Sequence, residues 1–247
     1  MKILVACEES QAVTKELRDL GHEAYSCDIL PCSGGKPEWH IMDDVETVIN
    51  NKPFMTEDGN KKEVRSWDMM IGFPPCIHLA NSGAKHFKLK REDGRQRDAI
   101  KFFMMLMTAD IPKIAIENPM NIISGNYVKE HFPDLCEKYN LPIKKTQTIQ
   151  PYMFGDAVKK TTWLWLKGLP KLVETENVEN DVKYYVSKKG AKMSEWYAKQ
   201  IIVDGKKCGY NTPEFKKHRS KTFPGIAKQM AIQWMQPIKE LQLFAQE

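Results

Sequence analysis

The sequence predicts an α/β fold with a largely parallel central sheet. Short apolar runs typical of buried strands occur at residues 2–6, 68–73 and 113–116, and helical spacing of apolar residues lies between them. This alternation of strand and helix is the order found in α/β domains. Polar residues or prolines follow each strand, so a catalytic or ligand-binding site is expected at the carboxyl edge of the sheet.

The first thirty residues are predicted to form the opening βαβ unit. The strand at residues 2–6 is followed by apolar positions at helical spacing from Ala12 to Leu20, and Gly21 ends the helix. A second strand at residues 22–27 then ends at Asp28. The carboxyl ends of these two strands are expected at the same edge of the sheet.

The middle of the chain places a cysteine directly after a strand. Residues 31–65 are rich in Gly, Pro, Asp, Asn and Lys, and predict only a short strand near His40 and a helix at 45–50. The strand at 68–73 runs into Pro74 and Pro75, which cannot continue a hydrogen-bonded ladder. Cys76 is therefore expected in a loop.

The remaining elements follow from the same patterns. A helix is expected at 95–109, a strand at 113–116 that ends at Glu117-Asn118-Pro119, and a helix at 127–139. Further strands are expected at 146–150, 161–166 and 182–186, with a last helix at 223–242 that Pro237 kinks or breaks. Trp163 and Trp165 alternate along a strand, which favours packing in the core over base stacking.

Composition narrows the class of protein. The 247 residues suffice for one main domain with a small appendage, and the net charge of +5 suits an anionic partner such as nucleic acid. No run of eighteen apolar residues occurs, so neither a membrane span nor a signal peptide is expected. The six cysteines lack CxxC spacing, and His78 and His86 lack partners at ligand spacing. A metal-free protein of the reducing cytoplasm is expected.

Cys76 and Glu117 form a pair suited to pyrimidine chemistry. A thiolate can add to carbon 6 of a cytosine, and a carboxylic acid can protonate or hydrogen-bond ring nitrogen 3. Together these groups make carbon 5 nucleophilic enough to accept a methyl group. The two residues follow two different strands of the expected sheet.

Both segments resemble motifs of the C5-cytosine DNA methyltransferases. Gly72-Phe73-Pro74-Pro75-Cys76 resembles their Pro-Cys nucleophile motif, and Glu117-Asn118-Pro119 resembles their Glu-Asn-Val motif, in the same order. The chain is most similar to short phage-type DNA cytosine methyltransferases, which share segments like those at 150–155, 164–170 and 219–227. The resemblance implies a Rossmann-like sheet that binds S-adenosylmethionine, with a small basic subdomain facing the target DNA.

The resemblance also implies roles for individual residues. Cys76 would be the nucleophile and Glu117 the acid at nitrogen 3 of a cytosine flipped out of duplex DNA. Asp28 would accept the ribose hydroxyls of S-adenosylmethionine, and Asp44 would reach its adenine amine. The full set implied to contact the cofactor is Cys7, Glu8, Asp28, Ile29, Asp44 and Pro74, and the set implied to contact the base is Pro75, Asn118 and Pro119. The implied organisation is a catalytic domain at 1–150, a target-recognition-like region at 151–218 and a helix at 219–247 that packs back on the catalytic domain.

The sequence departs from the family in two places. The first loop, Ala6 to Gln11, contains no glycine, and the family's Gln-x-Arg-x-Arg segment is absent. The span available for target recognition is short, which predicts relaxed or very short sequence specificity. Two alternatives stay open: a methyltransferase acting on a pyrimidine in RNA or a free nucleotide, and a catalytically silent nucleic-acid-binding protein. The basic residues between Lys85 and Arg97 either follow phosphates or are solvated charge.

Overall fold

The computed structural model describes residues 1–50, 52–186, 190, 192–198, 201–203, 205–209 and 212–235. The chain divides into two compact units. The first unit comprises Met1–Thr148 and Thr161–Lys171, and the second comprises Ile149–Lys160 and Leu172–Glu247. The chain therefore enters the second unit, returns once to the first, and ends in the second.

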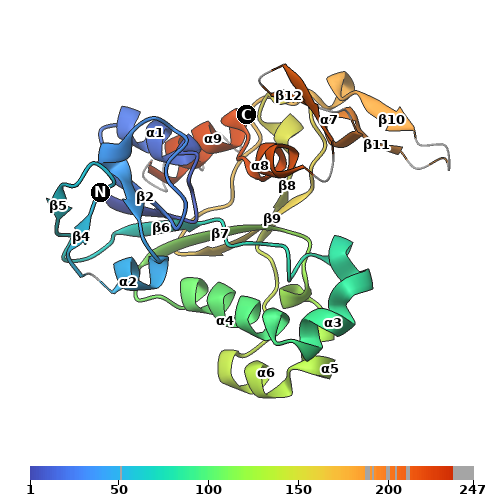
Figure 1. The fold of residues 1–247 in the computed structure, drawn as a ribbon, viewed down its shortest axis with the longest axis horizontal. Helices are drawn as coiled ribbons and strands as arrows, with labels where there is room; N and C mark the ends of the chain where they lie inside the picture. Colours follow the sequence, from blue (N-terminus) through green and yellow to red (C-terminus); the bar gives the residue numbers. More distant parts are fainter. Residues whose placement is uncertain are drawn as a thin grey trace. The chain divides into compact units, whose positions relative to one another are not determined.

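A mostly parallel sheet forms the centre of the first unit (Figure 1). Its seven strands lie in the order β3-β2-β1-β6-β7-β9-β8. Their bounds are β1 Lys2–Ala6, β2 Glu23–Asp28, β3 His40–Met42, β6 Met69–Gly72, β7 Lys113–Pro119, β8 Gln147–Ile149 and β9 Thr162–Lys167. Pairing is parallel from β3 through β7, whereas β9 runs antiparallel to β7. This sheet confirms the predicted α/β fold class with a mostly parallel, Rossmann-like sheet.

Helices cover both faces of this sheet. In Figure 1, α1 lies on one face, and α4 lies on the other with α3, α5 and α6 beside it. The bounds are α1 Ala12–Asp19, α2 Val45–Ile49, α3 Phe87–Glu92, α4 Arg95–Met107, α5 Tyr127–His131 and α6 Pro133–Tyr139. On α4, Phe103 is fully buried and meets the Trp165 ring edge-on, with centroids 5.0 Å apart. Core packing of Trp165 is thus confirmed.

One glycine lets the central strand β6 approach its neighbours closely. A Cβ added to Gly72 would lie 2.9 Å from Ile116 Cδ1 and 3.5 Å from Leu106 Cδ1. Side-chain atoms do not tolerate the shorter distance in a close-packed interior. Gly72 therefore allows the strand that leads into Pro74, Pro75 and Cys76 to pack against β7 and α4.

Within the first unit, the structure differs from the predicted elements in three places. The helix expected at 127–139 is two helices, α5 and α6, because Pro133 lacks an N–H and pushes Phe132 to φ −140° and ψ 55°. Strand β7 continues through Pro119, since the antiparallel strand β9 supplies partners for Glu117 and Asn118. The sequence pattern did not predict α3 or the hairpin of β4 (Phe54–Met55) and β5 (Lys61–Lys62).

The second unit is built from small hairpins and helices. Its elements are β10 Tyr184–Val186, β11 Lys192–Ser194, β12 Ile201–Val203, β13 Lys206–Cys208, α7 Glu195–Ala198, α8 Pro213–Ser220 and α9 Pro224–Met235. The described part of the expected last helix is α9, and its expected continuation through Pro237 to 242 lies outside the described residues.

Both units also contain short 3₁₀ helices. Their bounds are Pro37–Trp39, Asn81–His86, Ile122–Ser124, Pro151–Met153 and Glu179–Asp181.

The segments at 150–155 and 219–227 meet within the second unit. A Cβ on Gly225 would lie 1.9 Å from the Phe154 carbonyl oxygen, and the Gly225 N–H donates to Asp156 Oδ2 at 2.9 Å. Only glycine permits this approach of α9 to the turn at Gly155. The segments at 150–155 and 219–227 therefore form one packed corner.

The charge of the chain is divided unequally between the units. The first unit contains 22 basic (Lys, Arg) and 22 acidic (Asp, Glu) residues, whereas the second contains 15 and 10. The whole excess of +5 therefore belongs to the second unit. Among the described helices, none is both long and apolar enough to cross a membrane.

Candidate functional site

Four predicted segments end side by side at the carboxyl edge of the sheet. Ala6 pairs with Cys27 on one side and Gly72 on the other, and Gly72 pairs with Ile116. The next residues along these four strands are Asp28, Cys7, Phe73 and Glu117. Neighbouring strands lie about 4.8 Å apart, so the three strand steps from Asp28 to Glu117 span roughly 14 Å.

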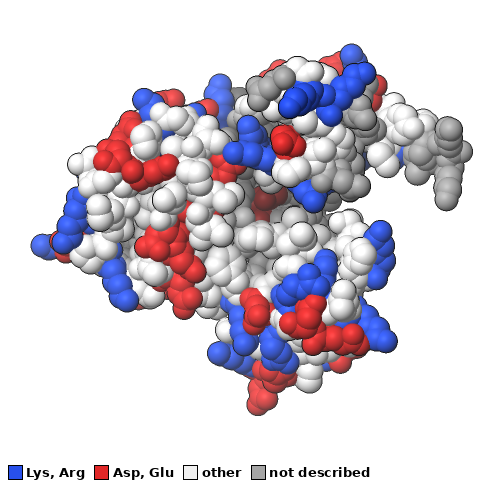
Figure 2. Space-filling model, viewed as in Figure 1, with Lys and Arg blue, Asp and Glu red and all other residues white. Residues whose placement is uncertain are grey.

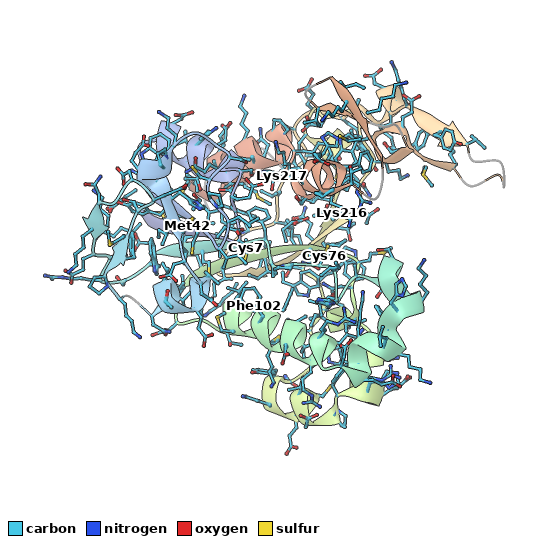
Figure 3. All side chains as sticks on the ribbon, viewed as in Figure 1. Cys7, Met42, Cys76, Phe102, Lys216 and Lys217 are labelled. Atoms are coloured by element: carbon cyan, nitrogen blue, oxygen red, sulfur yellow. The ribbon has the colours of Figure 1, made fainter. Side chains whose placement is uncertain are left out.

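The direction of the strand order reverses between β1 and β6. From β1 the chain builds outward through β2 and β3, and it then returns to build outward through β6 and β7. Ligands of open α/β sheets bind at such a switch point, outside the carboxyl ends of the strands. Cys7 follows β1 and Cys76 follows β6, and Figure 3 shows both beside the central sheet.

The first loop makes its tight path without glycine. Cys7 and Gln11 both adopt left-handed backbone conformations, with φ of 60° and 57°. For residues other than glycine this costs about 1 kcal/mol each. The Gln11 side chain offsets part of the cost, because its Nε2 donates to Lys36 O (2.8 Å) and Ser26 Oγ (3.2 Å) and its Oε1 accepts from Lys36 N (3.1 Å). Residues 33–36 thus support the loop, and glycine is not required in it.

Glu8 holds this loop to helix α1. The side chain is buried, and its Oε1 accepts the Val13 N–H at 2.6 Å while Oε2 accepts the Thr14 hydroxyl at 2.7 Å and the Thr14 N–H at 3.3 Å. Burial raises the pKa of Glu8 to about 7, although these hydrogen bonds act to lower it. A contact between this carboxylate and a cofactor would compete with the bonds to α1.

Three of the residues implied to bind the cofactor lie near one another. Burial and, to a smaller extent, the negative charges of Asp28 and Asp44 together raise the pKa of Cys7 to about 12. Asp28 is half-buried; burial also raises its pKa, and its Oδ1 accepts the Leu30 N–H at 3.0 Å. Asp44 begins helix α2 by accepting the Glu46 N–H at 3.0 Å.

An exposed apolar surface lies beside this acidic cluster. Ile29 follows Asp28 and is 74% exposed, and Met42, which pairs with Asp28 across the sheet, is 53% exposed. Large apolar side chains are usually buried, so their exposure at the ligand edge of a sheet indicates a contact surface. A carboxylate next to apolar side chains suits a nucleoside, whose ribose is polar and whose base has apolar faces.

Cys76 lies at the outer surface of a tight turn. Its carbonyl oxygen accepts the N–H groups of Leu79 (3.0 Å) and Ala80 (2.8 Å). Of the six cysteines of the chain it is the only exposed one. Pro74 is buried and Pro75 is exposed, so the loop leaves the sheet between them.

Asn118 joins the loop that follows β6 and contains Cys76, called the cysteine loop below, to the strand that carries Glu117. Its Nδ2 donates to the Pro74 carbonyl oxygen at 2.7 Å, and its Oδ1 accepts the Asn121 side-chain amide at 3.0 Å. Asn118 is only 1% exposed. These hydrogen bonds hold the loop to β7, and the implied contact of Asn118 with the base stays a prediction.

Backbone hydrogen bonds strengthen the same connection. The Asn81 N–H donates to Met120 O at 3.0 Å, and the Ile122 N–H donates to Leu79 O at 3.1 Å. The segments after β6 and after Glu117 thus form a short ladder of their own. Glu117 itself is half-buried and pairs with Leu164 on β9, and Pro119 pairs with Thr162.

Most basic residues after the cysteine loop are engaged within the first unit. Arg95 pairs with Asp93, Arg97 with Asp134 at 2.5 Å, and Lys88 approaches Glu92 at 4.0 Å. Arg91 donates to the Tyr127 hydroxyl at 2.6 Å, and Lys90 donates to Ile77 O at 2.5 Å. These contacts weaken the interpretation in which the whole group follows phosphates.

Sequence patterns did not predict the structural role of three residues that build this edge. They are Gln11, Asn121 and Lys90, of which Lys90 was predicted only as part of a basic group. Asn118 and Asn121 lie three residues apart after a strand, which is a signal for side-chain capping of a turn. Lys90 gives no comparable signal, because helix α3 was not predicted. In the described part of the chain, no three His, Cys, Asp or Glu side chains gather where they could hold a metal ion.

Comparisons with known proteins give matches among solved structures. No protein-family model matches the chain, and no curated protein matches it significantly. Among solved structures, 58 chains match. One is a crystal structure provisionally described as a DNA modification methyltransferase encoded within a prophage of E. coli, with 13% identity over 72% of this chain and a TM-score of 0.42. The match spans about half (53%) of that protein. The chemistry of this chain is therefore inferred from its own residues.

Proposed function

We propose that this protein methylates carbon 5 of cytosine in DNA, using S-adenosylmethionine and a covalent bond to Cys76. One observation carries the proposal. The exposed Cys76 lies in a loop that Asn118 binds to strand β7, next to Glu117, on the sheet edge that also holds Asp28. A nucleophile, an acid and a ribose-binding carboxylate are what this reaction needs, and the sequence resemblance implies the same three roles.

The residues on the β1–β3 side fit the proposed cofactor. Asp28 would accept the ribose hydroxyls, Ile29 would cover the adenine ring and Asp44 would bind its amine. Main-chain atoms of Cys7 and Glu8 would face the methionine part, with Pro74 across from them. When bound, S-adenosylmethionine supplies the methyl group. The span of roughly 14 Å from Asp28 to Glu117, three strands apart, leaves room for a nucleoside and a pyrimidine placed end to end.

The proposed reaction uses Cys76 and Glu117 in turn. The Cys76 thiolate adds to carbon 6, while Glu117 hydrogen-bonds or protonates nitrogen 3 and so receives the developing charge. Carbon 5 then takes the methyl group. Loss of the carbon 5 proton to water, return of the nitrogen 3 proton to Glu117 and cleavage of the sulfur–carbon bond restore the aromatic ring and release the thiolate. Pro75 and Pro119 would border the flipped base, and Asn118 would hold the loop.

The second unit is the proposed contact for the DNA. It contains the whole basic excess of the chain, and Figure 2 shows Lys and Arg side chains over its visible surface. On its β10–β11 hairpin, Tyr185 (45% exposed) pairs with Met193 (40% exposed), and Lys192 lies 4.1 Å above the Tyr184 ring. A basic two-stranded ribbon with exposed apolar side chains suits a DNA groove.

Transfer of a labelled methyl group from S-adenosylmethionine to duplex DNA tests the proposal. We expect transfer that requires cytosine in the duplex, that Cys76→Ser abolishes, and that the control Cys136→Ser retains. Transfer that persists in Cys76→Ser would refute the covalent mechanism.

The same assay separates the two alternatives. Transfer to RNA or to a free cytidine nucleotide, with none to DNA, would favour a different pyrimidine acceptor. No transfer to any acceptor, together with no binding of S-adenosylmethionine by calorimetry, would favour a silent nucleic-acid-binding protein.

A further inference from the structure

A buried lysine lies beneath the cysteine loop. Lys90 on α3 is 8% exposed, and its Nζ donates to the carbonyl oxygen of Ile77, the residue after Cys76, at 2.5 Å. Among the described residues, no carboxylate forms an ion pair with it. A buried ammonium without a counter-charge is destabilising, and groups that carry such a cost cluster at functional sites.

The surroundings of Lys90 centre on the same loop. A Cβ added to Gly83, which lies in the 3₁₀ turn Asn81–His86, would be 3.2 Å from Lys90 Nζ, so the turn closes over the ammonium. His78 also lies near this charge: burial lowers its pKa first, and Lys90 and Arg95 lower it further. The His78 Nδ1 atom is buried without a hydrogen-bond partner.

We propose that Lys90 is a positioning residue for Cys76: it fixes the loop by binding the Ile77 carbonyl and holds a positive charge against the main chain one residue beyond the thiol. This role rests on the proposed function of Cys76 as a nucleophile. The bond holds the main chain one residue beyond the cysteine, while the Ile77 side chain stays 65% exposed. A fixed loop keeps the sulfur in line with carbon 6, and a nearby cation favours the thiolate.

The variants that test this role leave the other charged groups around the loop unchanged. Glu117 lies on the neighbouring strand β7, and Asp93 and Arg95 lie at the junction of α3 and α4. His78 lies within the loop itself. The variants below change none of these groups, so a change in Cys76 reactivity reports on Lys90.

Alkylation of Cys76 by iodoacetamide, followed by peptide mass spectrometry, tests the proposal directly. For Lys90→Met at pH 7, we expect alkylation about tenfold slower, which corresponds to one unit in the pKa of the thiol. In methyl transfer we expect kcat about 100-fold lower, with KM for S-adenosylmethionine nearly unchanged, as for a misplaced reacting group. Lys90→Arg keeps a donor and a charge, and we expect it to recover most of both losses.

Two further variants make the result decisive. Lys88→Met removes an exposed lysine from the same helix, and we expect it to behave as wild type. Gly83→Ala keeps Lys90 but requires its ammonium to move by a few tenths of an ångström, and we expect it to slow alkylation, though less than Lys90→Met does, even if Lys90→Met fails to fold. Wild-type alkylation rates in folded Lys90→Met and Gly83→Ala would overturn the proposal. Because alkylation needs no methyl transfer, this outcome is distinguishable from failure of the proposed function.

Discussion

The side-chain amide of Asn118 donates to the carbonyl oxygen of Pro74 at 2.7 Å. This bond joins the loop after β6 to strand β7 and therefore fixes Cys76 relative to Glu117. Both groups are shielded from water, since Asn118 and Pro74 are buried. A buried hydrogen bond between two proposed catalytic segments has consequences for stability and for rate.

Replacing Asn118 by Ala should impair both properties. The change leaves the Pro74 carbonyl and the Asn121 amide without this partner, at a cost of about 1–3 kcal/mol in the free energy of unfolding. We also expect kcat for methyl transfer to fall by about 100-fold, because the loop is no longer fixed. Urea denaturation and methyl-transfer kinetics measure the two effects. The exposed Asn126→Ala is the control; equal behaviour of the two variants would show that the bond has no such role.

Glu8 should make stability depend on pH. Its pKa is about 7 in the folded protein and 4.5 in an ordinary glutamate, so between these values the folded protein binds more protons than the unfolded chain. The free energy of unfolding therefore falls as pH rises from 4.5 to 7, by on the order of 3 kcal/mol. Denaturation at several pH values should show a flatter profile for Glu8→Gln, whereas Glu16→Gln should keep the wild-type slope. Parallel profiles in wild type and Glu8→Gln would contradict this interpretation.

Asp28 should determine cofactor affinity. If its carboxylate accepts the ribose hydroxyls, Asp28→Asn should weaken binding of S-adenosylmethionine by about tenfold or more, since hydrogen bonds to a charged group contribute about 1.5–3 kcal/mol. Calorimetry measures this change, with the exposed Asp19→Asn as the control. Unchanged affinity in Asp28→Asn would remove Asp28 from the proposed cofactor site.

The basic second unit should set the salt dependence of DNA binding. Lys206 and Lys207 are exposed on β13, and Lys61 and Lys62 form a matched exposed pair on β5 of the first unit. Replacing Lys206 and Lys207 by Gln should weaken binding and reduce the slope of log K against log salt by about 0.9 for each phosphate that is no longer neutralised. The same change at Lys61 and Lys62 should leave the slope as it is. Titrations with duplex DNA at several salt concentrations decide between the two units; a larger effect at Lys61 and Lys62 would place the DNA elsewhere.

Much of the first unit could be predicted because its signals are local. Apolar runs marked β1, β2 and β6, and the prolines at 74 and 75 marked the exit of Cys76 from the sheet. The continuation of β7 through Glu117 was not predictable, because it depends on pairing with β9, which lies more than forty residues along the chain. Antiparallel pairing between distant segments has no local signature.

The proposed reactive groups of the candidate site could be assigned from local patterns, whereas their supports could not. In the sequence Cys76, Glu117 and Asp28 each mark the end of an apolar strand pattern, and in the structure Asp28 and Glu117 are still part of β2 and β7. The positioning of Cys76 by Asn118 and Lys90 requires knowledge of which buried polar atoms meet. The conformation of the first loop could not be predicted either. Nothing in the sequence indicates that Cys7 and Gln11 adopt the left-handed backbone conformation that glycine usually takes.

The most direct test of the central claim is a covalent adduct between Cys76 and its target base. In duplex DNA containing 5-fluorocytosine, carbon 5 carries no proton to lose after methyl transfer, so the sulfur–carbon bond cannot break and the protein should stay attached. We predict an adduct that requires S-adenosylmethionine, maps to Cys76 by peptide mass spectrometry and is absent in Cys76→Ser. Methylation of ordinary DNA without this adduct, or an adduct at another residue, would contradict the account.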